Sequence, residues 1–234
     1  MILYVNGDSH TAAAEATNPH GFASDDSRYF YMGEAPHPDN LAVSWGRVLS
    51  DNLKTTFHCH AQAGASNDRI IRTSQEFLTK CNNEKSNCLM VIQWSTWERQ
   101  EWQINGKYYQ VGASGTDSVP EHYQTQYKEF IAGIDWHTAT QHEHDKIWAF
   151  HKELDRHSIP HIFFNGNNHF DRIKNKKDWG NSYIGPYEAD KTYDSILKSA
   201  GYQTVAPGNW HYGPGAHRHW AKFMLQYIIA NQFI

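Results

Sequence analysis

Short apolar runs alternate with longer amphipathic stretches along the chain. Residues 88–92 form the clearest run, and a continuous apolar segment of this kind is typical of a strand buried on both faces of a parallel sheet. The pattern also predicts strands at residues 2–5, 55–61, 159–164 and near Val205. It predicts helices within residues 39–49, 68–81, 147–154, 188–200 and 214–229. This alternation is typical of βαβ units, so we predict an α/β fold with a parallel sheet.

Length and composition favour one domain. The chain has 234 residues, of which 39% are hydrophobic and 14% aromatic. A chain of this size can bury the core of one α/β domain but is short for two of full size. Residues 97–135 are aromatic and polar with weak periodicity, which indicates an insertion. We therefore predict a single domain over residues 1–234 with an insertion around 97–135.

Charge, cysteine content and hydropathy limit which partners and which cellular location we expect. The formal net charge is −4 and no basic stripe is present, so we expect no nucleic-acid partner. The three cysteines have no CxxC spacing, which favours a reducing compartment over a disulfide framework. No apolar run has the length of a membrane span or a signal peptide. We expect a soluble cytoplasmic protein without a membrane partner or cofactor; a virion-associated location is the alternative, and the oligomeric state stays open.

Polar residues that could take part in catalysis follow the predicted strands. Ser9 comes after the first strand, Gly64 after the second, and residues 94–97 after the third; His211 lies just before the last predicted helix. Ligand sites in open α/β sheets form at the carboxyl ends of the strands. A serine hydroxyl needs an imidazole base and oxyanion donors to act as a nucleophile, and these segments supply candidates for both.

The order of these segments resembles that of the SGNH hydrolases, the GDS-type lipases and esterases. Gly7-Asp8-Ser9 stands where that family has its Gly-Asp-Ser block, and residues 208–211 have the layout of its terminal Asp-x-x-His block. The resemblance extends over residues 2–230 and implies a three-layer α/β/α sandwich, flavodoxin-like, with about five parallel strands. It implies Ser9 as nucleophile, His211 as base, and the backbone amides of Ser9 and Gly64 as oxyanion hole; Asn67 is a further candidate donor.

Two positions depart from the family pattern. The third block of the family is Gly-x-Asn-Asp, and Trp97 occupies the place of its Asn, so a third oxyanion donor has to come from Ser95, Thr96 or Asn67, or is absent. Gly208 occupies the place of the triad Asp. A Ser-His dyad is the expectation, assisted by a backbone carbonyl or a distant carboxylate such as Asp171. If Gly208 does not need a positive φ, Gly208→Asp is expected to restore the acid.

Other residues near the strand ends are candidates with structural alternatives. Asp8, Trp97, Asn165 and Asn168 are candidate substrate contacts, although residues 165–169 also suit a polar turn and Trp97 suits core packing. Histidine pairs with i, i+2 spacing occur at residues 58 and 60, 142 and 144, and 217 and 219. No third ligand accompanies any of these pairs, so we predict no metal site.

The function expected from these features is ester hydrolysis through an acyl-enzyme, on a small or carbohydrate-borne ester. The alternative is a catalytically degenerate protein that keeps the fold as a binding or structural module, for example in a viral or surface assembly. The absence of the family's Asn and Asp favours that alternative.

Overall fold

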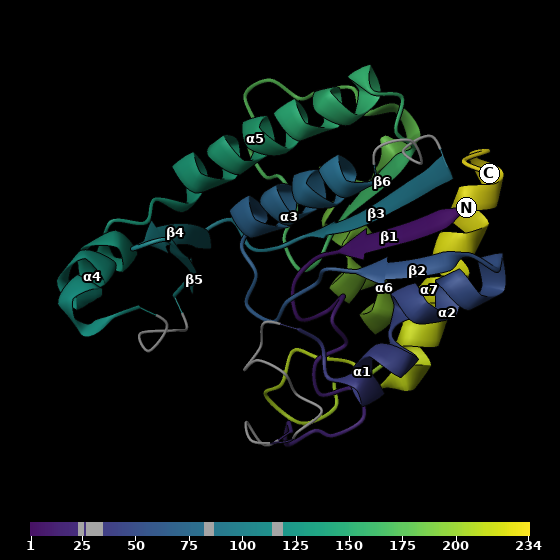
Figure 1. Cartoon of the computed structure of the whole chain (residues 1–234), viewed down its shortest axis with the longest axis horizontal. Helices are drawn as coiled ribbons and strands as arrows, with labels where there is room; N and C mark the ends of the chain where they lie inside the picture. Colours follow the sequence, from purple (N-terminus) through teal and green to yellow (C-terminus); the bar gives the residue numbers. More distant parts are fainter. Residues whose placement is uncertain (23–25, 27–34, 82–86, 114–118) are drawn as a thin grey trace.

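Figure 1 shows the chain as a computed structural model with mixed α/β architecture. The structure describes residues 1–22, 26, 35–81, 87–113 and 119–234. Within these residues, no helix is both long enough and apolar enough to cross a membrane.

A five-stranded sheet with the order β2-β1-β3-β6-β7 forms the centre of the molecule. Its strands are β2 (Thr56–Cys59), β1 (Ile2–Asn6), β3 (Cys88–Trp94), β6 (His161–Asn165) and β7 (Tyr183–Ile184). All neighbours are parallel, as predicted, and every residue of β1, β3 and β6 is buried because helices cover both faces. The strand order reverses between β1 and β3, the point at which doubly wound sheets place their ligand sites.

Helices form one layer on each face of this sheet (Figure 1). The helices α3 (Asn67–Lys80) and α5 (Trp136–Arg156) pack against one face, where Tyr4, Met90 and Phe163 are buried. The opposite face is covered by α2 (Trp45–Leu53), α6 (Tyr193–Ser199) and α7 (Pro214–Ala230). This arrangement is the predicted three-layer α/β/α sandwich. Short 3-10 helices lie at Glu121–Tyr123, Gly180–Ser182 and Ala189–Lys191.

Two helices differ from the sequence prediction for local reasons. Residues 39–49 do not form one helix, because Ser44 is extended and its side chain accepts a hydrogen bond from the Arg47 amide, which separates α1 (Pro38–Val43) from α2. The helix α5 begins at Trp136, earlier than residue 147, because Asp135 caps it by accepting from the Thr138 amide. Its first turns are mostly exposed, so they carry no apolar periodicity.

The strand predicted near Val205 is wrong. The fifth strand is β7, and residues around 205 form only an isolated bridge between Thr204 and Tyr212. The Val205 amide donates to the His211 carbonyl, so this segment folds back on itself. As a result, His211 lies on a closed loop directly before α7 rather than after a strand.

Residues 97–135 contain a hairpin and a helix beside the main sheet. The antiparallel strands β4 (Gln100–Ile104) and β5 (Lys107–Val111) are joined at Asn105 and Gly106, both with positive φ, as a two-residue hairpin turn requires. The helix α4 (Gln124–Ala132) contributes Tyr127 to a small apolar cluster with Val111 and Val119. Residues 114–118 lie outside the described residues. That this segment is an insertion into a single domain stays a prediction.

Candidate active site

Ser9 lies on the loop that leaves β1 at the carboxyl edge of the sheet. The loop turns tightly, because the Ala12 amide donates to the Asp8 carbonyl and the Ala14 amide to the Ser9 carbonyl. Asp8 and His10 are buried, whereas Ser9 is partly exposed. Within the described residues, neither the hydroxyl nor the amide of Ser9 has a hydrogen-bond partner. The hydroxyl is therefore accessible and not engaged elsewhere.

The Asp8 carboxylate fixes this loop to the segment after β3. Its Oδ1 accepts from the His10 amide at 3.0 Å and from Gln93 Nε2 at 2.7 Å. Its Oδ2 accepts from Ser95 Oγ at 3.0 Å and from Arg99 at 3.3 Å. Burial opposes ionisation of Asp8, but the nearby His10 and Arg99 outweigh it and lower the pKa. Asp8 thus has a structural role here, and its contact with a substrate stays a prediction.

The glycine of the Gly-Asp-Ser segment is explained by close packing. A Cβ at Gly7 would lie 2.5 Å from Thr11 Oγ1 and 2.9 Å from two atoms of Gln93. Gln93 Oε1 also accepts from the amide and the hydroxyl of Thr11, at 3.1 and 2.7 Å. Only glycine leaves room for this contact between the two loops.

The His211 ring contacts a carboxylate that no sequence motif marks. His211 Nδ1 lies 3.0 Å from Glu15 Oε2, and the same oxygen accepts a hydrogen bond from Asn209. The His211 amide in turn donates to Asn209 Oδ1 at 2.7 Å. Partial burial opposes ionisation of Glu15, but the hydrogen bonds from Asn209 and His211 outweigh it and lower its pKa. The partner of the imidazole is therefore an ionised Glu15.

This pair corrects the expectation for the acid. The carboxylate near His211 is not Asp171, which is exposed and pairs with Arg172. Gly208, at the family position of the acid, has a φ of +78° and is exposed, so an Asp there would be strained. The sequence held only a weak signal for Glu15: it is a carboxylate within a few residues of Ser9.

The loops of Ser9 and His211 meet beside a small cavity. The rings of His10 and His211 have centroids 5.6 Å apart. A cavity of about 200 Å³ is lined by Glu15 and His211 together with Ala12, Phe22 and Ala63, among others. Within the described residues, no hydrogen bond joins Ser9 to His211. The structure thus places the two loops together without a closed Ser-His contact.

The candidates for the oxyanion hole have contrasting environments. Gly64 lies in an exposed turn with a φ of +76°, and its amide has no partner within the described residues. The Asn67 side chain is buried; its Oδ1 accepts from the Ser95 amide at 2.8 Å, and its Nδ2 donates to Glu143 at 3.0 Å. The hydroxyls of Ser95 and Thr96 donate to Asp8 and Glu98. The backbone amides of Ser9 and Gly64 are thus the donors that stay free.

Three candidate substrate contacts lie at or near the same edge. Trp97 is 3% exposed and stacks on Phe170 with a centroid distance of 4.6 Å, so it packs in the core. Asn165 is buried and accepts from the Tyr183 hydroxyl at 2.5 Å. Asn168 is partly buried, and its Nδ2 has no hydrogen-bond partner in the part of the chain that the structure describes. Their roles toward a substrate stay predictions.

One group of side chains among the described residues has a geometry suited to a metal ion. It consists of His151, Asp155 and His161, and none of the histidine pairs noted from the sequence belongs to it. These residues lie on α5 and at the start of β6, apart from Ser9.

Comparison with known proteins gives a family and a set of distant structural neighbours. Residues 37–168, more than half of the chain, match the model of a family described as a family of unknown function, DUF6071. The chain belongs to this family. A search of curated proteins finds no match to it.

Solved structures with a similar arrangement include the acetyl xylan esterase Est2A from the rumen bacterium Butyrivibrio proteoclasticus, at 12% identity and a TM-score of 0.44, covering 100% of this chain and 65% of that one. A carbohydrate esterase, whose active site is described as displaying divergent catalytic and non-catalytic binding functions, is 10% identical with a TM-score of 0.44, and the match covers 100% of this chain and 66% of that one. An extracellular lipase from Streptomyces rimosus is 12% identical with a TM-score of 0.43, and the match covers 99% of both chains. This chain therefore spans less than two thirds of the length of the two esterases. At these values the similarities assign no activity to this chain.

The segment that matches DUF6071 holds only part of the candidate site. Gly64, Asn67 and Ser95 lie within residues 37–168, whereas Ser9, Glu15 and His211 lie outside it. Membership of the DUF6071 family therefore assigns no role to the nucleophile, the base or the acid.

Proposed function

We propose that this protein is an ester hydrolase of the SGNH type, with Ser9 as nucleophile, His211 as general base and Glu15 as the acid of the triad. The observation that carries the proposal is the 3.0 Å contact between His211 Nδ1 and the ionised Glu15 carboxylate. A carboxylate at Nδ1 holds the imidazole in the tautomer that leaves Nε2 free to accept a proton, and it stabilises the imidazolium that forms.

The proposed reaction proceeds through an acyl-enzyme. Ser9 Oγ attacks the acyl carbon of the ester while His211 Nε2 takes the hydroxyl proton. The amides of Ser9 and Gly64 bind the oxyanion of the tetrahedral intermediate. As the intermediate collapses, the proton passes from His211 to the leaving alcohol. Water then attacks the acyl-enzyme while His211 takes its proton, and collapse of the second intermediate releases the carboxylic acid and returns the proton to Ser9.

This mechanism requires a Ser9 to His211 hydrogen bond when substrate is bound. Catalytic hydrogen bonds are often long in free enzymes and tighten in the complex. Two observations support this step: the Ser9 hydroxyl has no other partner within the described residues, and its loop is held by Asp8 at one end and Glu15 at the other.

The cavity beside His211 and Glu15 supports a small substrate; Ser9 and Gly64 are not among its lining residues. A volume of about 200 Å³ is below the range of roughly 300–1,000 Å³ that is typical of sites for drug-sized ligands. We therefore propose a short acyl ester as substrate, on a small or carbohydrate alcohol.

The test is hydrolysis of p-nitrophenyl acetate by the wild type, Ser9→Ala and a control, Ser199→Ala. Ser199 is an exposed serine at the end of α6, so its loss should leave the rate unchanged. We expect Ser9→Ala to lose turnover to the background rate. Equal rates for Ser9→Ala and the wild type would remove Ser9 from the mechanism.

One observation favours a second candidate, a non-catalytic binding module. Ser9 and His211 are not hydrogen-bonded to each other, and the side chains of Ser95, Thr96 and Asn67 are engaged within the protein. A protein that is inactive on activated esters but binds an oligosaccharide in a titration would establish this function instead.

A further inference from the structure

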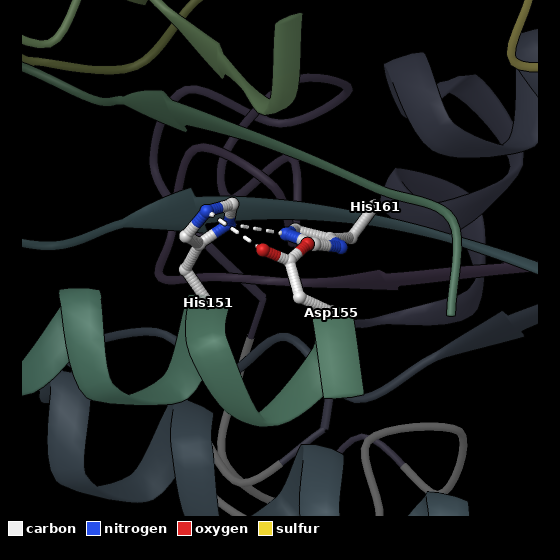
Figure 2. Close-up of side chains that lie close together, drawn as sticks. All are labelled: His151, Asp155 and His161. Carbon is white, nitrogen blue, oxygen red and sulfur yellow. Dashed lines mark hydrogen bonds and ion pairs between the residues drawn. The ribbon is translucent and has the colours of Figure 1, made fainter. Parts of the chain in front are cut away.

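Two buried histidines and an exposed aspartate lie together at the edge of the sheet opposite Ser9. His151 and Asp155 are one turn apart on α5, and His161 is the first residue of β6 (Figure 2). The strands are parallel, so the start of β6 lies at the edge where they begin, whereas Ser9 follows the end of β1. This group is therefore separate from the candidate active site.

The polar atoms of the three side chains face one another. His151 Nδ1 lies 2.8 Å from His161 Nε2, and His151 Nε2 lies 3.3 Å from Asp155 Oδ2. One ligand atom from each residue lies within 4.8 Å of the other two. Trp148 and Trp179 pack against the His151 ring, at centroid distances of 4.9 and 5.3 Å, and hold it in place.

The hydrogen bonds determine where the protons of this group can be. His161 Nδ1 lies 2.8 Å from the Ile159 carbonyl, which only accepts, so Nδ1 carries the proton and Nε2 presents a lone pair toward His151. If His151 is neutral with its proton on Nε2, facing Asp155, two nitrogen lone pairs meet at 2.8 Å. If the proton is on Nδ1, a lone pair faces the Asp155 carboxylate at 3.3 Å. In each neutral arrangement, therefore, two acceptor atoms face each other with no positive charge between them.

We propose that this group binds one divalent transition-metal ion of the zinc class, with His151, His161 and Asp155 as ligands and water in a fourth position. Two imidazoles and a carboxylate are a common ligand set for zinc. Tetrahedral ligands at about 2.0–2.1 Å from zinc lie roughly 3.3 Å apart, so the two rings have to separate by about half an ångström. The Ile159 carbonyl orients His161, as outer hydrogen bonds do in metal sites.

The surroundings of the group suit a bound metal ion. His151 and His161 are 4% and 2% exposed, so little water can reach the nitrogen atoms that face each other. Lys152 donates to Asp155 Oδ2 at 2.9 Å, but its side chain is half exposed and can turn into solvent when a metal binds. The ion would join the last turn of α5 to the first residue of β6, a structural role independent of ester hydrolysis. This proposal departs from the sequence prediction of no metal site.

The test uses metal-free protein titrated with Zn²⁺ by calorimetry and with Co²⁺ by visible absorption. The variant is Asp155→Asn, which changes an exposed side chain and preserves its size. The control is His137→Asn, an exposed histidine on the same helix and outside the group. Circular dichroism checks that each variant is folded.

We expect one Zn²⁺ per chain with a Kd of about 1 μM or tighter, and tetrahedral Co²⁺ bands. Asp155→Asn should weaken binding at least tenfold and remove the bands, and His137→Asn should change neither. The expected binding should also raise the Tm of the wild type when Zn²⁺ is in excess. Absence of binding at about 100 μM Zn²⁺, or equal binding by wild type and Asp155→Asn, would overturn the proposal and leave a proton as the shared cation.

Discussion

The two carboxylates of the loop after β1 have contrasting environments. Asp8 is buried and accepts hydrogen bonds from His10, Gln93, Ser95 and Arg99. Glu15 is partly exposed and is held by Asn209 and His211. Both pKa values are lowered, so both groups are ionised at neutral pH. The difference is that Asp8 fixes the backbone beside Ser9, whereas Glu15 contacts a ring at the edge of a cavity. We infer that Asp8 stabilises the loop and that Glu15 assists His211 in catalysis.

The largest effect is expected for Glu15→Gln on turnover. An amide keeps the size of the side chain but does not stabilise imidazolium, and the equivalent change in a serine protease costs on the order of ten-thousand-fold in kcat. We expect a loss of roughly a thousand- to ten-thousand-fold with p-nitrophenyl acetate, with little change in Tm. The exposed Glu129→Gln serves as control. A kcat within tenfold of wild type would show that Glu15 is not the acid.

Asp8→Asn tests the structural role of Asp8 through the free energy of unfolding. The amide leaves Arg99 without its charge partner and places a second donor beside Ser95. Breaking a buried ion pair typically costs 3–5 kcal/mol, and Arg99 keeps some contact with water, so we expect a loss of roughly 3 kcal/mol. Urea denaturation measures it. A loss below about 1 kcal/mol would contradict an anchoring role for Asp8.

The buried His217 gives a smaller effect that depends on pH. Burial and the nearby His10 and His211 lower its pKa to about 3, whereas the unfolded value is about 6.5. Between these values the unfolded chain binds a proton that the native state does not, so His217 makes stability fall as the pH decreases from 6.5 toward 3. We expect His217→Gln to reduce the slope of unfolding free energy against pH by about 1.4 kcal/mol per pH unit. An unchanged slope would show that His217 titrates normally.

Gly208→Asp should have the smallest effect. The direction of the change in kcat shows whether position 208 or Glu15 supplies the carboxylate for His211. The sequence pattern predicts a gain in kcat, on condition that Gly208 does not need a positive φ. Because φ is +78° and Glu15 already pairs with His211, we expect no gain and a stability loss of about 1 kcal/mol. A clear rise in kcat would mean that Glu15 does not act as the acid.

The sheet could be predicted where its strands are long enough to carry a pattern. β1, β3 and β6 are continuous apolar runs, and the half-exposed β2 lies within the β-prone residues 55–61, so all four strands are predicted. β7 has only two residues and therefore no pattern, so a strand was expected near Val205 instead. The β4–β5 hairpin was missed, although Asn105-Gly106 is a strong hairpin-turn signal.

The candidate site could be predicted only where a local motif marks it. Gly7-Asp8-Ser9 and His211 are candidates because of their positions in the chain and the family resemblance. Glu15 contacts His211 across 196 positions, and no sequence spacing marks this contact. His151 and Asp155 are one helical turn apart, but the third residue, His161, is brought to them by the turn between α5 and β6. Contacts of this kind depend on the fold and are not visible in the sequence.

The central claim, that Ser9 is activated by His211 and Glu15, is tested most directly by fluorophosphonate labelling followed by mass spectrometry. The account predicts one adduct per chain, located on Ser9, that is absent in Ser9→Ala and forms far more slowly in His211→Ala, because the two residues act as a unit. A folded wild-type protein that stays unlabelled, or that is labelled at Ser9 equally fast without His211, would contradict it.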